Sequence, residues 1–305
     1  MTRRKKTKTS RAQPPAKRSR TPWFWAATGG AIVALVAALI AVSVLRDEGG
    51  SKSDAAAERG PVHVHGLGIN PADGALYIAT HTGMWRVARG ERAPKPVGES
   101  RQDTMGFTVS APGHFLGSGH PDSFDQPPLL GLIESFDSGA TWKPISLLGE
   151  ADFHVLRSVG SRIYGYDVSH AQLMVSRDRG KTWAERNPNG RVLDLVPDPT
   201  SPDRIVATTE AGLLGSSDGG SSWNKIGSAV GLLGWPARNR LYLVTADGDV
   251  LVSRDAGRDW TRVGAIGGQP AAFLAQTPSD LYAAVHDGSI VRSRDGGRSW
   301  RAVTT

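Results

Sequence analysis

One motif, Ser-x-Asp-x-Gly-x-x-Trp, recurs five times from residue 135 onward. Its copies end at Trp142, Trp183, Trp223, Trp260 and Trp300, so successive tryptophans are 41, 40, 37 and 40 residues apart. Short apolar segments fill each interval, and 37 glycines and 19 prolines fit many tight turns better than long helices. A period near 40 residues with strand-like content predicts a β-propeller in which each repeat forms one blade.

A sixth repeat precedes the five, although its motif has decayed. Residues 76–98 align with residues 205–227 without a gap, and Val87, Arg89, Glu91 and Pro94 stand where the motif has Ser, Asp, Gly and Trp. We therefore expect an all-β fold, a six-bladed propeller spanning residues 61–305. The predicted blades cover residues 61–98, 102–148, 151–188, 190–227, 228–265 and 268–305. No strand is left over to join the two ends in one blade, so closure is expected to depend on side-chain packing between the first and last blades.

The motif residues have the chemistry of a tight turn. An aspartate can accept hydrogen bonds from the N–H groups of its own turn, and a glycine permits positive φ. The tryptophan begins the next strand and is expected to pack between sheets. The motif carboxylates are therefore predicted to be structural; they are Asp137, Asp178, Asp218, Asp255 and Asp295.

The motif resembles the Asp-box, or BNR repeat, of the sialidase-like superfamily of propellers, and the resemblance covers residues 61–305. It implies the propeller fold. That superfamily includes sialidases and other glycoside hydrolases, but also sortilin-type receptors and photosystem assembly factors that catalyse nothing. The resemblance therefore leaves two functions open, a binding or assembly module and a glycoside hydrolase.

Sialidase chemistry requires three arginines, a tyrosine nucleophile polarised by a glutamate, and an aspartic acid. The resemblance implies an Arg-Ile-Pro sequence in the first blade, but the Arg-Ile pairs here begin at Arg162 and Arg204, and no proline follows either. Tyr164 and Tyr166 have no recognisable glutamate partner. Hydrolase activity is thus implied by the resemblance alone, with Asp122 and Asp167 as candidate catalytic residues.

A membrane anchor is predicted ahead of the propeller. Residues 23–45 carry no charge, and as a helix they would span roughly 34 Å, enough to cross a bilayer. A cleaved signal peptide is the alternative, but the apolar stretch is longer than usual and no clear cleavage site closes it.

The charge distribution orients this anchor. The whole chain has a formal charge of +7, but residues 1–22 hold nine basic and no acidic residues, which leaves 27 basic against 29 acidic residues elsewhere. We expect residues 1–22 to be a cytoplasmic tail, residues 46–60 a flexible linker, and the propeller to be extracytoplasmic on a single-pass plasma-membrane protein. The predicted partners are the bilayer, through residues 23–45, and an extracytoplasmic protein, glycan or small ligand. No nucleic-acid partner is expected, because topology accounts for the basic charge.

Most histidines are predicted to lie on one face of the propeller. Loops between second and third strands, and connections between blades, share the face opposite the motif turns. Seven of the eight histidines map there: His63, His65, His81, His120, His154, His170 and His286. The enlarged loop that begins at His120 also carries Asp122 and Asp125, whereas His114 maps to the motif face.

Imidazoles and carboxylates at a channel mouth suit copper or zinc, and the absence of cysteine excludes thiolate ligands. Candidate ligands are His63, His65, His81 and His120, with Met105 as a soft supplement for copper. All seven histidines and Asp122 are candidates for binding a polar ligand. The alternative is that each histidine caps a loop through hydrogen bonds.

Overall fold

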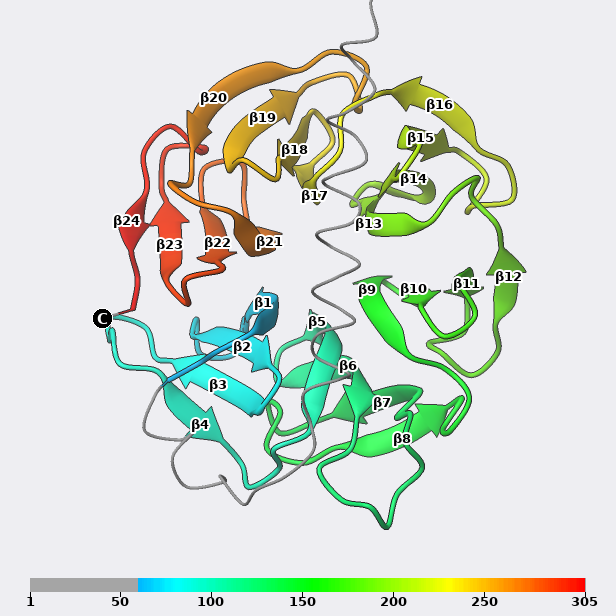
Figure 1. Ribbon diagram of the computed structural model, residues 1–305, viewed down its shortest axis with the longest axis vertical. Coiled ribbons are helices and arrows are strands. Elements are labelled where there is room, and N and C mark those ends of the chain that lie inside the picture. Colours follow the sequence, from blue (N-terminus) through cyan, green and yellow to red (C-terminus); the bar gives the residue numbers. More distant parts are fainter. Residues whose placement is uncertain (1–59, 305) are drawn as a thin grey trace, which may run out of the picture. The chain divides into compact units, whose positions relative to one another are not determined.

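The computed structural model describes residues 60–304 and confirms an all-β, six-bladed β-propeller (Figure 1). Each blade is one antiparallel sheet of four strands in chain order. In Figure 1 the first strand of every blade faces the centre of the ring and the fourth lies at its outer edge. None of the described residues belongs to a helix with the length and apolar character needed to cross a bilayer. The predicted anchor at residues 23–45 and the tail before it lie outside the described residues, as does the linker up to residue 59.

The strands are as follows. Blade 1 contains β1 (Val64–Ile69), β2 (Leu76–Thr80), β3 (Gly83–Val87) and β4 (Lys95–Val97). Blade 2 contains β5 (Asp103–Ala111), β6 (His114–His120), β7 (Leu132–Ser135) and β8 (Lys143–Ser146). Blade 3 contains β9 (Phe153–Val159), β10 (Arg162–Asp167), β11 (Gln172–Ser176) and β12 (Ala184–Arg186). Blade 4 contains β13 (Val192–Asp198), β14 (Ser201–Thr209), β15 (Gly212–Ser216) and β16 (Asn224–Gly227). Blade 5 contains β17 (Leu232–Ala237), β18 (Arg240–Val244), β19 (Asp249–Ser253) and β20 (Thr261–Ala265). Blade 6 contains β21 (Pro270–Ala275), β22 (Leu281–Val285), β23 (Ile290–Ser293) and β24 (Arg301–Ala302).

The motif forms a hydrogen-bonded turn after the third strand of blades 2 to 6. In blade 3 the Ser176 hydroxyl donates to Oδ1 of Asp178 at 2.8 Å and accepts from the Gly180 N–H at 2.7 Å. The other oxygen of Asp178 accepts from the Thr182 hydroxyl at 2.7 Å. The Thr182 N–H donates to Oδ1 at 2.9 Å, and this bond, with those from the hydroxyls of Thr182 and Ser176, lowers the pKa of Asp178 to about 2. The five motif glycines all have φ between 85° and 93°, a region that favours glycine.

Each motif tryptophan packs at the interface with the preceding blade. Trp142, for example, lies against a core cluster that contains Met84 of blade 1 and Phe115 of blade 2. In four motifs the indole N–H donates to the carbonyl of the motif glycine, at 2.9–3.1 Å. In blade 3 the indole of Trp183 donates instead to the hydroxyl of Ser146 in blade 2. The tryptophan therefore ties each motif turn to the neighbouring sheet.

The ring closes between blades 6 and 1 by side-chain packing. We call this interface the seam. Val64, Leu67 and Trp85 of blade 1 pack here against Tyr282 and Ile290 of blade 6. The two blades remain separate four-stranded sheets, as the sequence predicted. The seam has no motif tryptophan, because the position in blade 1 is Pro94.

Candidate ligand and metal site

The structure places seven of the eight histidines on the face opposite the motif turns. They lie at the starts of innermost strands β1 and β9 or at the ends and loops of second strands β2, β6, β10 and β22. We call them, together with Asp103, Asp152 and Asp167, the rim cluster. His114 lies instead at the β5–β6 turn on the motif face, where its ring stacks on Phe136 and its Nε2 lies 3.0 Å from Glu134. That histidine is engaged in local packing.

Asp103, the first residue of β5, is the centre of the rim cluster. Nδ1 of His81 lies 2.8 Å from its Oδ2, and Nδ1 of His120 lies 3.6 Å from the same oxygen. Nε2 of His65 lies 3.4 Å from its other oxygen, Oδ1. Three imidazoles from blades 1 and 2 therefore converge on one carboxylate.

His120 extends the rim cluster from blade 2 to blade 3. Its Nε2 lies 3.5 Å from Oδ2 of Asp152, and the same oxygen lies 2.9 Å from Nε2 of His154. The Asp152 N–H donates to Oδ1 of Asp167, whose Oδ2 lies 2.7 Å from Nδ1 of His170. The polar contacts thus form a continuous chain along the rim.

His63 and His286 lie at the edge of the rim cluster, near blades 1 and 6. The rings of His63 and His81 are 6.2 Å apart. Burial lowers the pKa of His63, and the neighbouring His81 and His65 lower it further. His286 lies near enough to contribute in the same direction. Met105 is half-buried in β5, two residues after Asp103.

Charges at the rim cluster favour ionised carboxylates and one imidazolium. Burial would raise the pKa of Asp103, but His120, His65 and His81 outweigh burial and hold that pKa well below its usual range. Asp103 and Asp152 raise the pKa of His120 to about 10. Burial would raise the pKa of Asp152, but His120 and His154 lower it to about 2. His120 is therefore a cation between two anions.

Three buried atoms of the rim cluster lack hydrogen-bond partners among the described residues: Oδ1 of Asp152, Nε2 of His65 and Oδ1 of Asp103. The last two face one another at 3.4 Å, without the geometry of a hydrogen bond. Donor atoms of His65, His81 and Asp103 all lie within 4.8 Å of one another. A buried polar atom without a partner is costly, so this arrangement is suited to a bound cation.

A channel runs below the rim cluster between the innermost strands. Its cavity measures about 430 Å³ and is lined by residues of all six blades, including His65 and His154. Deeper in the channel, Arg157 of β9 lies 2.8 Å from Asp194 of β13. Asp194 also accepts hydrogen bonds from the N–H groups of Leu195 and Leu233, so its carboxylate ties three blades together.

Some residues predicted for the site have other partners. The carboxylate of Asp122 accepts from the Ser100 hydroxyl and the Arg101 N–H, which attaches the enlarged β6–β7 loop to the connection between blades 1 and 2. Asp167 is buried, and both its oxygens accept hydrogen bonds within the protein. Neither carboxylate has the environment of a free acid or nucleophile.

Asp103 and Asp152 are the site residues that the sequence analysis missed. Both stand at the start of an innermost strand, the position that drew attention to His63 and His154. Asp152 is also two residues before His154, so an Asp-x-His pattern was present in the sequence.

Solved structures share the fold of this chain. The ancestral GH74 enzyme is 14% identical, with a TM-score of 0.52, over 76% of this chain and 36% of that one. The GH74 xyloglucanase from Xanthomonas campestris is 22% identical, with a TM-score of 0.54, over 80% of this chain and 45% of that one. This chain thus spans less than half the length of either enzyme.

YCF48 is similar over more of its own length. A structure of YCF48 bound to D1 peptide is 16% identical, with a TM-score of 0.50, over 80% of this chain and 83% of that one. YCF48 from Cyanidioschyzon merolae gives 15% identity and a TM-score of 0.50, with 78% and 84% covered. No family model and no curated protein matches the sequence. At these identities the likenesses show the fold alone.

Proposed function

We propose that this chain is a membrane-tethered, extracytoplasmic binding or assembly module whose ligand face is the rim cluster. We propose further that the cluster holds a divalent metal ion, copper or zinc, at His65, His81 and Asp103. The observation that carries the metal proposal is the pair of buried donor atoms on His65 and Asp103 that have no hydrogen-bond partner among the described residues. The tether through residues 23–45 rests on the sequence.

The residues present suit such an ion. Two imidazole nitrogens and a carboxylate oxygen form a ligand set that zinc accepts and that copper also accepts. His81 is 48% exposed, so its ring can adjust toward the ion at little cost in packing. His63, whose ring is 6.2 Å from that of His81, is a further candidate ligand, whereas His120 would first have to lose the proton that Asp103 and Asp152 stabilise. Met105 is the soft ligand proposed for copper. The remaining coordination position would be open to a ligand.

A binding role is supported by the surface beside the rim. The β6–β7 loop presents Phe124, which is fully exposed, on the same side as the rim cluster. Exposed aromatic side chains often carry much of the energy of a protein interface. YCF48, which shares this fold, has been solved bound to a peptide. The ligand classes proposed remain a protein, a glycan or a small molecule.

The alternative, a sialidase-like glycoside hydrolase, is supported by the fold of the GH74 enzymes. It is disfavoured by the charges at the rim, because a general acid must hold its proton near neutral pH. The pKa of Asp152 is about 2, and the pKa of Asp103 lies well below its usual range. Sugar release from a panel of fluorogenic glycosides, lost in Asp122→Asn or Asp167→Asn, would favour the hydrolase.

Metal binding tests the proposal directly. The full-length chain in detergent is stripped with a chelator and titrated with Cu²⁺ or Zn²⁺, with elemental analysis after desalting. We expect about one ion per chain and a loss of affinity of roughly 10-fold or more in His65→Ala, which removes a ligand. His114→Ala is the matched control, because His114 is a half-buried histidine on the opposite face.

Thermal unfolding gives a second measurement. An ion that binds only the folded chain stabilises it by about 2.7 kcal/mol at 100 times its Kd, so Tm should rise in the wild type and in His114→Ala. His65→Ala should show little of this rise. Absence of bound metal, or equal affinity in His65→Ala and His114→Ala, would overturn the metal site.

A further inference from the structure

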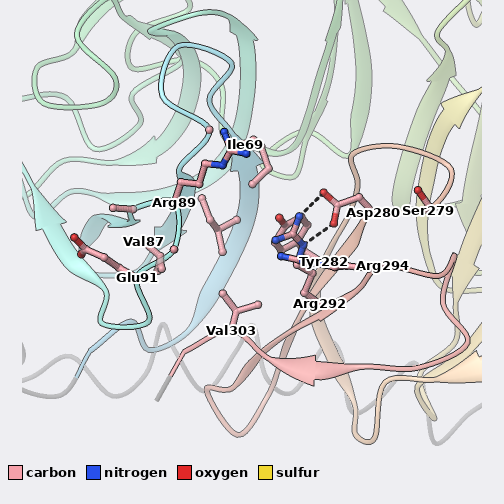
Figure 2. Close-up of a pocket in the computed structure, with 14 residues that line it drawn as sticks. Ile69, Val87, Arg89, Glu91, Ser279, Asp280, Tyr282, Arg292, Arg294 and Val303 are labelled. Atoms are coloured by element: carbon pink, nitrogen blue, oxygen red, sulfur yellow. Dashed lines mark hydrogen bonds and ion pairs between the residues drawn. The ribbon is translucent and has the colours of Figure 1, made fainter.

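A cavity of about 690 Å³ lies at the seam, on the side of the motif turns (Figure 2). In Figure 2, Ile69 and Arg89 of blade 1 face Tyr282, Arg292 and Asp280 of blade 6 across it. Its volume lies within the range of sites that bind small ligands or side chains.

The missing motif tryptophan explains why the cavity exists. Between blades 5 and 6, Trp300 packs against a core cluster that contains Tyr242, and Val252 and Val263 of blade 5 pack against the same cluster. The residues at the same positions of blade 6 are Tyr282, Arg292 and Val303, and all three line the seam cavity. Blade 1 has Pro94 where a tryptophan would fill this space. The seam therefore keeps the wall that receives the motif indole elsewhere in the ring, and Trp85, which also packs at the seam, does not line the cavity.

The lining also defines the charge of an occupant. Arg292 binds Asp280 through two bonds of 2.6 and 2.8 Å and lies 4.8 Å from the centre of the Tyr282 ring. The charges of Arg292 and Asp280 cancel, so this wall offers the aromatic ring of Tyr282 beside a neutralised ion pair. Of the other charged lining residues, Arg89 and Arg294 are basic and Glu91 is acidic, and all three are exposed. The entrance therefore carries a net positive charge.

We propose that the seam cavity binds a bulky aromatic side chain, tryptophan above all, presented by an acidic segment of a partner polypeptide. The ring enters the space between blades 1 and 6 that Tyr282 and Val303 line. Their counterparts in blade 5, Tyr242 and Val263, belong with Trp300 to one packed cluster. Acidic residues beside the aromatic side chain pair with Arg89 and Arg294 at the entrance. The site is on the face opposite the rim cluster and needs no metal.

A labelled peptide tests this site in the full-length chain. The probe is fluorescein-Asp-Glu-Trp-Glu-Asp-amide, titrated with protein at 0.15 M salt and followed by fluorescence anisotropy. Arg294→Glu should weaken binding by about 10-fold, since it reverses a charge at the entrance. Arg254→Glu is the matched control, because Arg254 is exposed, has the same motif position in blade 5, and lies on the blade whose interface with blade 6 contains Trp300. Both variants change the net charge of the protein equally.

A second variant and a second peptide test the aromatic part of the proposal. Pro94→Trp restores the tryptophan of the motif and should compete with the probe for the same space, so binding should be lost. The peptide with alanine in place of tryptophan should bind at least 10-fold more weakly than the probe. Equal affinities of Arg294→Glu and Arg254→Glu, equal affinities of the two peptides, or no binding of the probe at millimolar protein would each overturn the proposal.

Discussion

Replacing Trp300 by alanine should destabilise the propeller by about 3 kcal/mol. The ring packs between blades 5 and 6 against a core cluster that contains Tyr242 and Val250, and Val263 packs against the same cluster. A buried indole removes about 150–250 Å² from water, which at about 25 cal/mol/Å² corresponds to roughly 4–6 kcal/mol. One edge of Trp300 remains in solvent and alanine keeps its Cβ, so the expected loss lies toward the lower end of measured Trp→Ala changes.

Equilibrium unfolding in guanidinium chloride, followed by far-ultraviolet circular dichroism, measures this loss. Trp300→Phe keeps an aromatic ring in the interface and should lose about half as much. Arg301→Ala, the exposed neighbour in β24, should stay within about 0.5 kcal/mol of the wild type. A loss below about 1 kcal/mol in Trp300→Ala would mean that the ring does not fill the interface. It would also refute the explanation of the seam cavity by a missing motif tryptophan.

Three further predictions concern the motif turns. Asp259 stands where the other motifs have a threonine or serine whose hydroxyl donates to the motif carboxylate, but Asp259 donates to Asp255 through its N–H alone. Asp259→Thr should therefore add a hydroxyl bond and raise Tm by roughly 1–3 °C. A Tm no higher than that of Asp259→Asn would count against this bond. Arg179 has a φ of 63° where blade 4 has Gly219, so Arg179→Gly should stabilise by about 0.5–1 kcal/mol in guanidinium chloride, and a net loss would contradict the strain. The pKa of Asp178 is about 2 in the folded chain, below its value of 3.8 in the unfolded chain. The hydrogen bonds of its turn therefore stabilise the fold fully above about pH 4, and this stabilisation is lost as the pH falls toward 2. The guanidinium chloride midpoint should therefore fall between pH 4 and 2, and a constant midpoint would refute this.

The sequence predicted the ring well, because the signal was repeated. A motif at one period fixes the number of blades, and the gapless alignment of residues 76–98 recovered the blade whose motif had decayed. The position of the histidines followed from strand order alone, since alternate ends of antiparallel strands lie on opposite faces. His63, His81 and His120 accordingly lie on the predicted face.

The partners of those histidines could not be predicted in the same way. Asp103 and Asp152 belong to no motif, and their contact through His120 joins the neighbouring blades 2 and 3. Asp167 was a catalytic candidate because of its face, but its oxygens are occupied by the Asp152 N–H and by His170. Which carboxylate is occupied depends on packing between blades, and no single repeat encodes it.

The seam has a mechanical consequence for the ring. Among the six interfaces between blades, five are crossed by the polypeptide itself, whereas the described chain begins in blade 1 and ends in blade 6. Pulling the other five apart stretches a covalent connection, whereas within residues 60–304 the seam is held by packing such as that of the cluster containing Val64 and Ile290. A force that pulls blade 1 away from blade 6 is therefore resisted at the seam by hydrophobic packing and not by a covalent connection within the described residues.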